Sequence, residues 1–385
     1  MLPHNAADIM RARHAPQRAG DVAFAHFCRP TLSHHRPPDH ARLIARARRQ
    51  LTAARFITVP WPGGSLQAYA FEPDAAPTRS VLLVHGWTSE ASVMTAFAEP
   101  LRRKGVRVIA FDMPAHGLTL RGAPAGVIDG ADLTSAGERP TQAVTDPAAG
   151  GAAPVVPDAM VSEPTRAAAL PPTRSAALFP TRAAALFPTR SATLLPSRSA
   201  TLLPTRSAAL LPTRSATMLD CARALHAVTN ALGPFDGIIA HSMGALVALL
   251  VLEGGPPLPG PCAFQRMALI ASPNRLSAIT SAFAVRHSLS RPAQRAFERH
   301  LERVGHRPLE RFSAAALLAN APSQPRVLIT HSADDTDVPI AHAHELIAAH
   351  PSLTTQLVNH LGHARILYAP PTVRTVRDFM VDGSA

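Results

Sequence analysis

Short apolar runs alternate with longer stretches of helical periodicity through much of this chain. The runs have the length of β-strands, and uninterrupted apolar runs are typical of parallel strands that are buried on both faces. Strands that alternate with helices form a mostly parallel sheet with helices on its faces, so the sequence predicts an α/β fold. The expected strands are 80–84, 106–111, 237–240, 266–271, 326–330 and 355–358, and the expected helices are 91–104, 218–232, 276–319, 340–349 and one at the end of the chain.

The part of the chain before the first of these strands follows other patterns. Residues 1–37 are rich in His, Arg, Pro and Ala and have little periodicity, so we expect a loosely ordered lead-in. Over 39–55, apolar residues alternate with arginines at helical spacing, which predicts a surface helix. Two runs at 56–60 and 66–71 flank a Pro-Gly-Gly turn, and this arrangement predicts a β-hairpin.

A segment of different composition interrupts the pattern at residues 118–217. It begins with a Gly/Ala/Pro-rich spacer and continues as an eight-residue repeat that reads roughly P-T-R-S-A-A-L-L. Eight residues advance about 800° along an α-helix, so successive units turn by about 80° and form no continuous apolar stripe. Proline interrupts helices, and Pro, Ala and Arg are poor strand residues. We predict a disordered insertion without a catalytic role, which divides one domain into residues 38–117 and 218–385. The alternative is an Arg/Leu surface for acidic partners or membrane headgroups.

The net charge and the cysteines bear on which partners and which cellular compartment we expect for this protein. The formal net charge is +12 at pH 7, but the seven arginines of 164–219 account for more than half of it. No nucleic-acid-binding motif accompanies this charge, so we expect a small-molecule substrate and no nucleic acid. Three scattered cysteines give no disulfide framework and indicate a reducing compartment. Without a signal-like N-terminus or an apolar stretch of spanning length, we expect a cytoplasmic protein with no membrane span; the oligomeric state stays open.

The candidate nucleophile is Ser242. It follows the short apolar run at 237–240 and precedes a strongly apolar, helix-forming run, so the local pattern is strand, sharp turn, helix. A serine on such a turn projects its Oγ above the edge of the sheet, and small residues two positions away on each side let the backbones approach. Here the pattern is A-x-S-x-G, with Ala240 in the place where glycine is usual and Gly244 after the serine.

A serine hydroxyl needs a base, and the base needs an acid. Three aspartates, Asp334, Asp335 and Asp337, follow the strand at 326–330, where a carboxylate would lie at the same edge of the sheet. We choose Asp335, since Asp337 also fits a turn or cap. His363 follows the last strand behind a flexible glycine, which is the place that a Ser…Asp…His order requires for the base.

Two backbone N–H groups are expected to stabilise an oxyanion. One is that of Met243, directly after the nucleophile at a helix start, and the other is that of Trp87, in the loop after the strand at 80–84. His85, His116 and His241 are expected to shape the loops around the site. No metal-ligand motif occurs in the sequence, so neither a metal nor another cofactor is expected.

Five sequence blocks together resemble the α/β-hydrolase superfamily. They are VLLVHGW (81–87), FDMPAHG (111–117), IIAHSMGA (238–245), the D-x-x-V-P that begins at Asp335, and LGHARIL (361–367). The resemblance implies a Ser242–His363–Asp335 triad, oxyanion positions at Trp87 and Met243, and a helical lid at about 273–323.

The resemblance and the candidate residues together indicate a serine hydrolase that cleaves an ester-like acyl substrate through a covalent acyl-enzyme. The same triad also serves C–C hydrolysis and cofactor-free peroxidase chemistry, because a fold does not determine the substrate. A non-catalytic binding protein on the same scaffold is a further alternative. Carboxylic ester hydrolysis is the activity that we expect.

Overall fold

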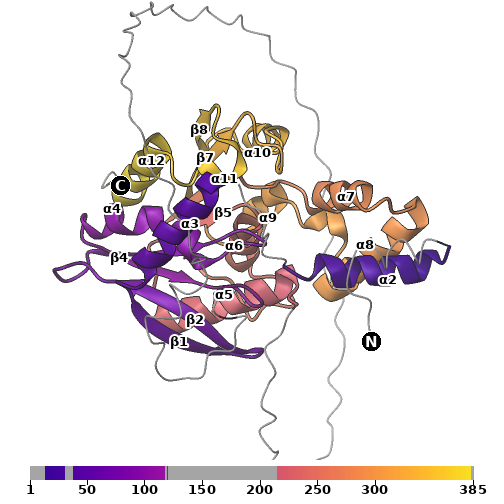
Figure 1. The fold of residues 1–385 in the computed structure, drawn as a ribbon, viewed down its shortest axis with the longest axis horizontal. Coiled ribbons are helices and arrows are strands. Elements are labelled where there is room, and N and C mark those ends of the chain that lie inside the picture. Colours follow the sequence, from indigo (N-terminus) through magenta and orange to yellow (C-terminus); the bar gives the residue numbers. More distant parts are fainter. Residues whose placement is uncertain (1–13, 31–37, 118, 120–214, 383–385) are drawn as a thin grey trace, which may run out of the picture. The chain divides into compact units, whose positions relative to one another are not determined.

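The computed structural model describes residues 14–30, 38–117, 119 and 215–382, and Figure 1 shows the arrangement of their helices and strands. This part contains an eight-stranded sheet in the order β1-β2-β4-β3-β5-β6-β7-β8. The pairs β1–β2 and β2–β4 are antiparallel and all others are parallel, which confirms the predicted α/β fold. The strands are β1 (Arg55–Trp61), β2 (Gly64–Phe71), β3 (Arg79–Val84), β4 (Val106–Phe111), β5 (Gly237–His241), β6 (Arg266–Ile270), β7 (Arg326–Ser332) and β8 (Thr354–Val358).

Both faces of the sheet are covered by helices. In β3, Leu82 and Val84 belong to one buried cluster, whereas Val81 and Leu83 belong to another, because successive side chains of a strand point to opposite faces. This double burial is the reason why the inner strands are continuous apolar runs. The first face packs against α5 (Met218–Leu232), α6 (Met243–Glu253), α9 (Ala314–Asn320) and α10 (Ala341–Ala349). The second packs against α3 (Pro38–Leu51), η1 (Ala91–Phe97), α4 (Ala98–Arg102) and α12 (Pro370–Val381).

The helical stretch expected at 276–319 divides into several pieces. These are α7 (Leu276–Arg286), α8 (Arg291–Gly305), the short η4 (Leu309–Arg311) and α9. Separately, after β8, a single helical turn, α11 (Gly362–Arg365), carries His363. The helix expected at 91–104 is also divided, into the 3₁₀ helix η1 and α4. No helix of the described residues is both long enough and apolar enough to cross a membrane.

The N-terminal stretch differs from the expectation of loose order. Residues Pro16–Phe27 form the helix α2, which packs along α8 (Figure 1). The two helices approach closely, because a Cβ added to Gly20 would lie 2.4 Å from the Cβ of Ala296. The packing face of α2 is built from Ala and Gly together with Val22, so it lacks the strong apolar periodicity that would have indicated a helix.

The predicted insertion at 118–217 falls almost wholly outside the described residues. The chain is described again from Ser215, and α5 begins with a capping box in which Thr217 accepts a hydrogen bond from the Asp220 N–H at 3.1 Å and the Asp220 carboxylate accepts one from the Thr217 N–H at 2.9 Å. This cap explains why the helix starts at the predicted position.

Two buried or half-buried arginines hold the end of the C-terminal helix against the sheet. Arg79 on β3 donates to the Met380 carbonyl at 3.0 Å, and Arg266 on β6 donates to the Phe379 carbonyl at 2.9 Å and to the Asp382 carbonyl at 2.6 Å. The last carbonyls of a helix have no partner within the helix, so these guanidinium groups satisfy them.

Candidate active site

Ser242 lies on a sharp turn between β5 and α6. Its backbone has φ 54° and ψ −128°, a region that is sparsely populated by residues other than glycine. Two features hold this strained conformation. The Ser242 N–H donates to the Ile270 carbonyl at 2.9 Å, and α6 begins so close to β3 that a Cβ on Gly244 would lie 2.4 Å from the His85 carbonyl oxygen. Ala240 is fully buried on β5, and the turn forms with alanine in this place.

The structure brings the three predicted side chains together, although they come from three separate loops. The Ser242 Oγ and the His363 Nε2 are 3.0 Å apart, and the His363 Nδ1 and an Asp335 Oδ2 are 2.8 Å apart. With a proton on Nδ1, His363 donates to the carboxylate and offers Nε2 as an acceptor to the serine hydroxyl. This tautomer is assigned from the hydrogen bonds. The arrangement can therefore move a proton from serine to imidazole.

The Asp335 carboxylate is buried and held from its other side. Its Oδ1 accepts hydrogen bonds from the N–H groups of Asp337 at 2.9 Å and Val338 at 2.8 Å. Burial acts to raise the pKa of this carboxyl. The hydrogen bond and charge of His363, together with the Val338 N–H, outweigh burial and hold the pKa below its usual value. Asp335 therefore stays ionised beside the imidazole.

The loop that carries His363 is anchored by Ser332, Asp334 and His241. The N–H of Gly362 lies 3.2 Å from both the Ser332 Oγ and an Asp334 Oδ1, so Asp334, one of the competing aspartates, holds the backbone of the loop. Gly362 has φ +57°, which allows the tight turn. From the opposite side, His241 donates from Nε2 to the His363 carbonyl at 3.0 Å. A Ser-x-Asp sequence after a strand is common, so Ser332 and Asp334 could not be identified from the sequence as anchors of this loop.

Two further histidines connect the loops after β3 and β4. The Nδ1 of His85 donates to the Gly86 carbonyl at 2.7 Å, and its Nε2 accepts from the Met113 N–H at 3.1 Å. The Nε2 of His116 accepts from the Thr88 N–H at 3.2 Å. Both rings use one nitrogen as a donor and the other as an acceptor, which is possible only for a neutral imidazole. These contacts agree with the predicted loop-shaping role.

Burial keeps these three site histidines neutral. It lowers the pKa of His85 to about 4, and it lowers the pKa of His116 and of His241 to about 3, with the neighbouring imidazoles acting in the same direction. The Nδ1 of His241 is buried without a hydrogen-bond partner among the described residues.

The predicted oxyanion residues lie next to the nucleophile. Trp87 and Met243 line the same cavity as Ser242. The N–H of Met243 is the first of α6 and has no intrahelical acceptor, as expected at a helix start. Neither this N–H nor that of Trp87 has a hydrogen-bond acceptor within the described part of the chain. Their role as oxyanion donors stays a prediction.

A cavity of about 290 Å³ opens above Ser242. Part of its wall comes from α7, within the lid predicted at 273–323. The other part comes from the end of α2, whose contribution had no signal in the sequence. The lining residues from these two elements and from the positions directly after them are Ile279, Ala282, Phe283, Arg286 and His287, and His26, Phe27 and Arg29.

Asp335, Asp337 and His363 are the only group of potential metal ligands among the described residues, with ligand atoms within 4.8 Å of one another. The hydrogen bond between Asp335 and His363 and that from the Asp337 N–H to Asp335 account for this proximity without an ion. We therefore interpret Asp335 and His363 as an acid–base pair, with Asp337 beside it.

Comparisons with known proteins place the chain in a family. The model of the alpha/beta hydrolase family matches residues 81–375. No curated protein matches the chain in sequence. The chain is similar in structure to the esterase domain of a Rhodothermus marinus protein, with 16% identity, coverage of 85% of this chain and 99% of that chain, and a TM-score of 0.42.

It is also similar to Est1E from Butyrivibrio proteoclasticus, with 12% identity, coverage of 85% and 98%, and a TM-score of 0.47. A third similar structure is an esterase from Pyrococcus furiosus, with 14% identity, coverage of 86% and 93%, and a TM-score of 0.43. These likenesses carry no argument about activity. The family model covers most of the chain, and the chain therefore belongs to the α/β-hydrolase family.

Proposed function

We propose that this protein is a serine hydrolase that cleaves a carboxylic ester by acyl transfer, with Ser242 as nucleophile, His363 as general base and Asp335 as the acid that orients the base. The observation that carries the proposal is the unbroken line of hydrogen bonds from Asp335 through His363 to Ser242, at 2.8 Å and 3.0 Å. Membership of a hydrolase family supports it.

In the first step, the Ser242 Oγ attacks the ester carbonyl and its proton passes to the His363 Nε2. The ionised Asp335 stabilises the imidazolium that forms. The N–H groups of Trp87 and Met243 receive the oxyanion, and losing one such donor typically costs about 3 kcal/mol of transition-state stabilisation. His363 then protonates the leaving alcohol, and an acyl group stays on Ser242.

In the second step, His363 takes a proton from water, and the resulting hydroxide attacks the acyl-enzyme. Ser242 regains its proton and the carboxylic acid leaves, so one ester and one water give one acid and one alcohol. Every group that this cycle needs is a side chain or a backbone N–H of the chain, and no cofactor takes part.

Labelling with a fluorophosphonate probe tests the proposal. We expect the wild-type protein to be labelled, the Ser242→Ala variant to be unlabelled, and a Ser281→Ala variant, altered at an exposed lid serine, to be labelled like the wild type. Hydrolysis of p-nitrophenyl esters should follow the same order. A folded wild-type protein that neither reacts with the probe nor hydrolyses any ester would instead be a binding protein on this scaffold.

A further inference from the structure

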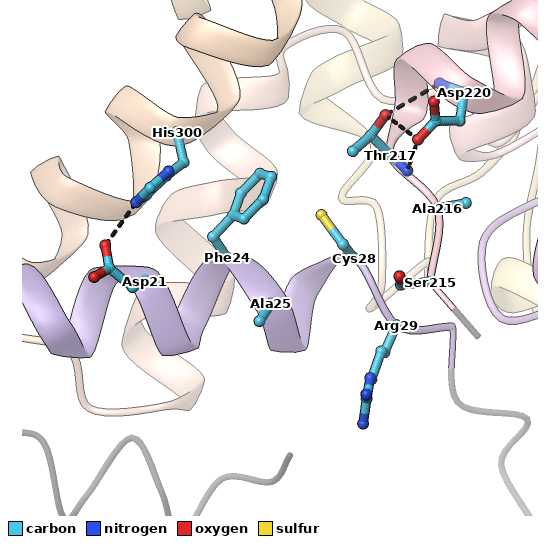
Figure 2. Close-up of a pocket in the computed structure, with 10 residues that line it drawn as sticks. All are labelled: Asp21, Phe24, Ala25, Cys28, Arg29, Ser215, Ala216, Thr217, Asp220 and His300. Carbon is cyan, nitrogen blue, oxygen red and sulfur yellow. Dashed lines mark hydrogen bonds and ion pairs between the residues drawn. The ribbon is translucent and has the colours of Figure 1, made fainter. Parts of the chain in front are cut away.

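A second, larger cavity lies beside the one above Ser242. It has a volume of about 470 Å³ and is formed by α2, α8 and the start of α5. In Figure 2, the Phe24 and Cys28 side chains lie between Asp21 and His300 on one side and Thr217 and Asp220 on the other. The remaining lining residues are Ala25, Arg29, Ser215 and Ala216.

Most polar groups of this wall are already paired with one another. His300 lies 2.6 Å from an Asp21 Oδ1, and Thr217 and Asp220 exchange the hydrogen bonds of the capping box. Burial raises the pKa of Cys28 to about 12, so its thiol is neutral and behaves as a small apolar group. Arg29 points away from the other labelled side chains (Figure 2). A ligand in this cavity would therefore meet a largely apolar surface.

A narrow space shares lining residues with both cavities. Its volume is about 10 Å³, which is room for about one water molecule. It shares Phe27, Trp87 and Met243 with the cavity above Ser242, and it shares Cys28, Ala216 and Thr217 with the second cavity. Met218 and Leu301 complete the wall. Methionine side chains are flexible, so Met218 and Met243 can move to widen this passage.

We propose that the acyl chain of an aliphatic ester passes from Ser242 through this narrow space and ends in the second cavity, so that the enzyme prefers medium- to long-chain acyl groups. The proposal rests on the proposed esterase function and adds the substrate class. Pockets that bind ligands of drug size have about 300–1,000 Å³. The cavity above Ser242, at about 290 Å³, lies just below that range, and the second cavity supplies the additional room.

The proposal gives α2 a function in substrate selection. This helix precedes residues 81–375, which match the family model; it contributes Phe24 and Ala25 to the second cavity, and Cys28 follows directly after it. Acyl-chain preference would then be determined partly by an element outside the matched region.

The test compares kcat/KM for p-nitrophenyl butyrate and p-nitrophenyl decanoate. Each methylene removed from water contributes about fourfold, so the wild-type protein should prefer decanoate. Ala25→Phe partly fills the second cavity and should lower the decanoate-to-butyrate ratio by about tenfold. Met218→Ala widens the passage and should raise the ratio. Ala316→Phe, at a partly buried alanine of α9 away from both cavities, is the matched control.

The outcomes separate the two proposals. If butyrate is hydrolysed and Ser242 is labelled, but neither Ala25→Phe nor Met218→Ala changes the ratio, the acyl-chain path is wrong and the esterase proposal stands. If no ester is hydrolysed and Ser242 is not labelled, both proposals fail. If Ala25→Phe does not fold, the ratio measured for Met218→Ala decides, because that variant changes the passage in the opposite direction.

Discussion

The buried histidines around Ser242 predict that the protein loses stability in mild acid. The pKa of His85 is lowered to about 4, and those of His116 and His241 to about 3, whereas a histidine in an unfolded chain titrates near 6.5. Between these values the unfolded state binds more protons than the folded state. The free energy of unfolding therefore falls as the pH is lowered through this window, and these three histidines no longer change it above about pH 7.5.

The magnitude follows from the shift. At pH 5 the unfolded state gains about 2 kcal/mol from protonation of each of these histidines, while the folded state gains almost nothing. Three such residues remove about 6 kcal/mol, which is comparable with the whole stability of many domains, about 5–15 kcal/mol. The carboxylates with lowered pKa values, such as Asp335, titrate at lower pH and contribute below this window.

Urea unfolding at pH 8, 6 and 5 measures the effect. Trp87 packs edge-on against His116 at 5.0 Å between ring centroids, so tryptophan fluorescence includes a signal from the site beside that of Trp61 on β1. With a slope of about 3 kcal/mol per M, the urea midpoint should fall by about 2 M between pH 8 and pH 5. In His116→Gln, whose amide can still accept from the Thr88 N–H, the fall should be smaller by about 0.7 M. A midpoint that stays constant from pH 8 to pH 5 would refute the reasoning.

Two other predictions concern single residues of the site. Asp335→Asn should keep the fold but lower kcat for ester hydrolysis by about 10³–10⁴-fold, because the amide favours the wrong tautomer of His363. A loss of kcat below tenfold would argue against Asp335 as the acid of the triad. Gly244→Ala should unfold at a lower temperature and lose at least about tenfold in kcat/KM, since its Cβ would meet the His85 carbonyl oxygen at 2.4 Å. Calorimetry measures the first effect and an esterase assay the second. An unfolding temperature and a kcat/KM equal to those of the wild type would contradict the close packing.

The sheet and the site core could be predicted because their signals are local. A strand buried on both faces is a continuous apolar run, and the order of the strands places Ser242, Asp335 and His363 at one edge of the sheet. The choice between Asp334 and Asp335 was harder. The two residues are neighbours in sequence, and only the backbone after β7 determines that Asp335 points to His363 while Asp334 binds the Gly362 N–H.

The features that the sequence does not predict depend on contacts between segments that are distant in the chain. The helix α2 is stabilised by small residues that fit against α8, and such a face carries little hydrophobic signal of its own. His241 is expected from the sequence to shape a loop of the site, but the group that it supports is not, because its acceptor, the His363 carbonyl, is 122 positions further along the chain. Neither contact leaves a pattern within one segment, so sequence periodicity could not have found them.

The arginines that hold the end of α12 have a consequence for synthesis of the chain. Arg79 and Arg266 belong to strands near the middle of the sheet, yet the carbonyls that they bind belong to residues 379–382, more than 100 positions further along the chain than either arginine. A nascent chain consequently carries two guanidinium groups without these acceptors until residues 379–382 have been synthesised. Removing the last turn of α12, or distorting it with a fused tag, would likewise leave Arg79 and Arg266 without these carbonyl acceptors.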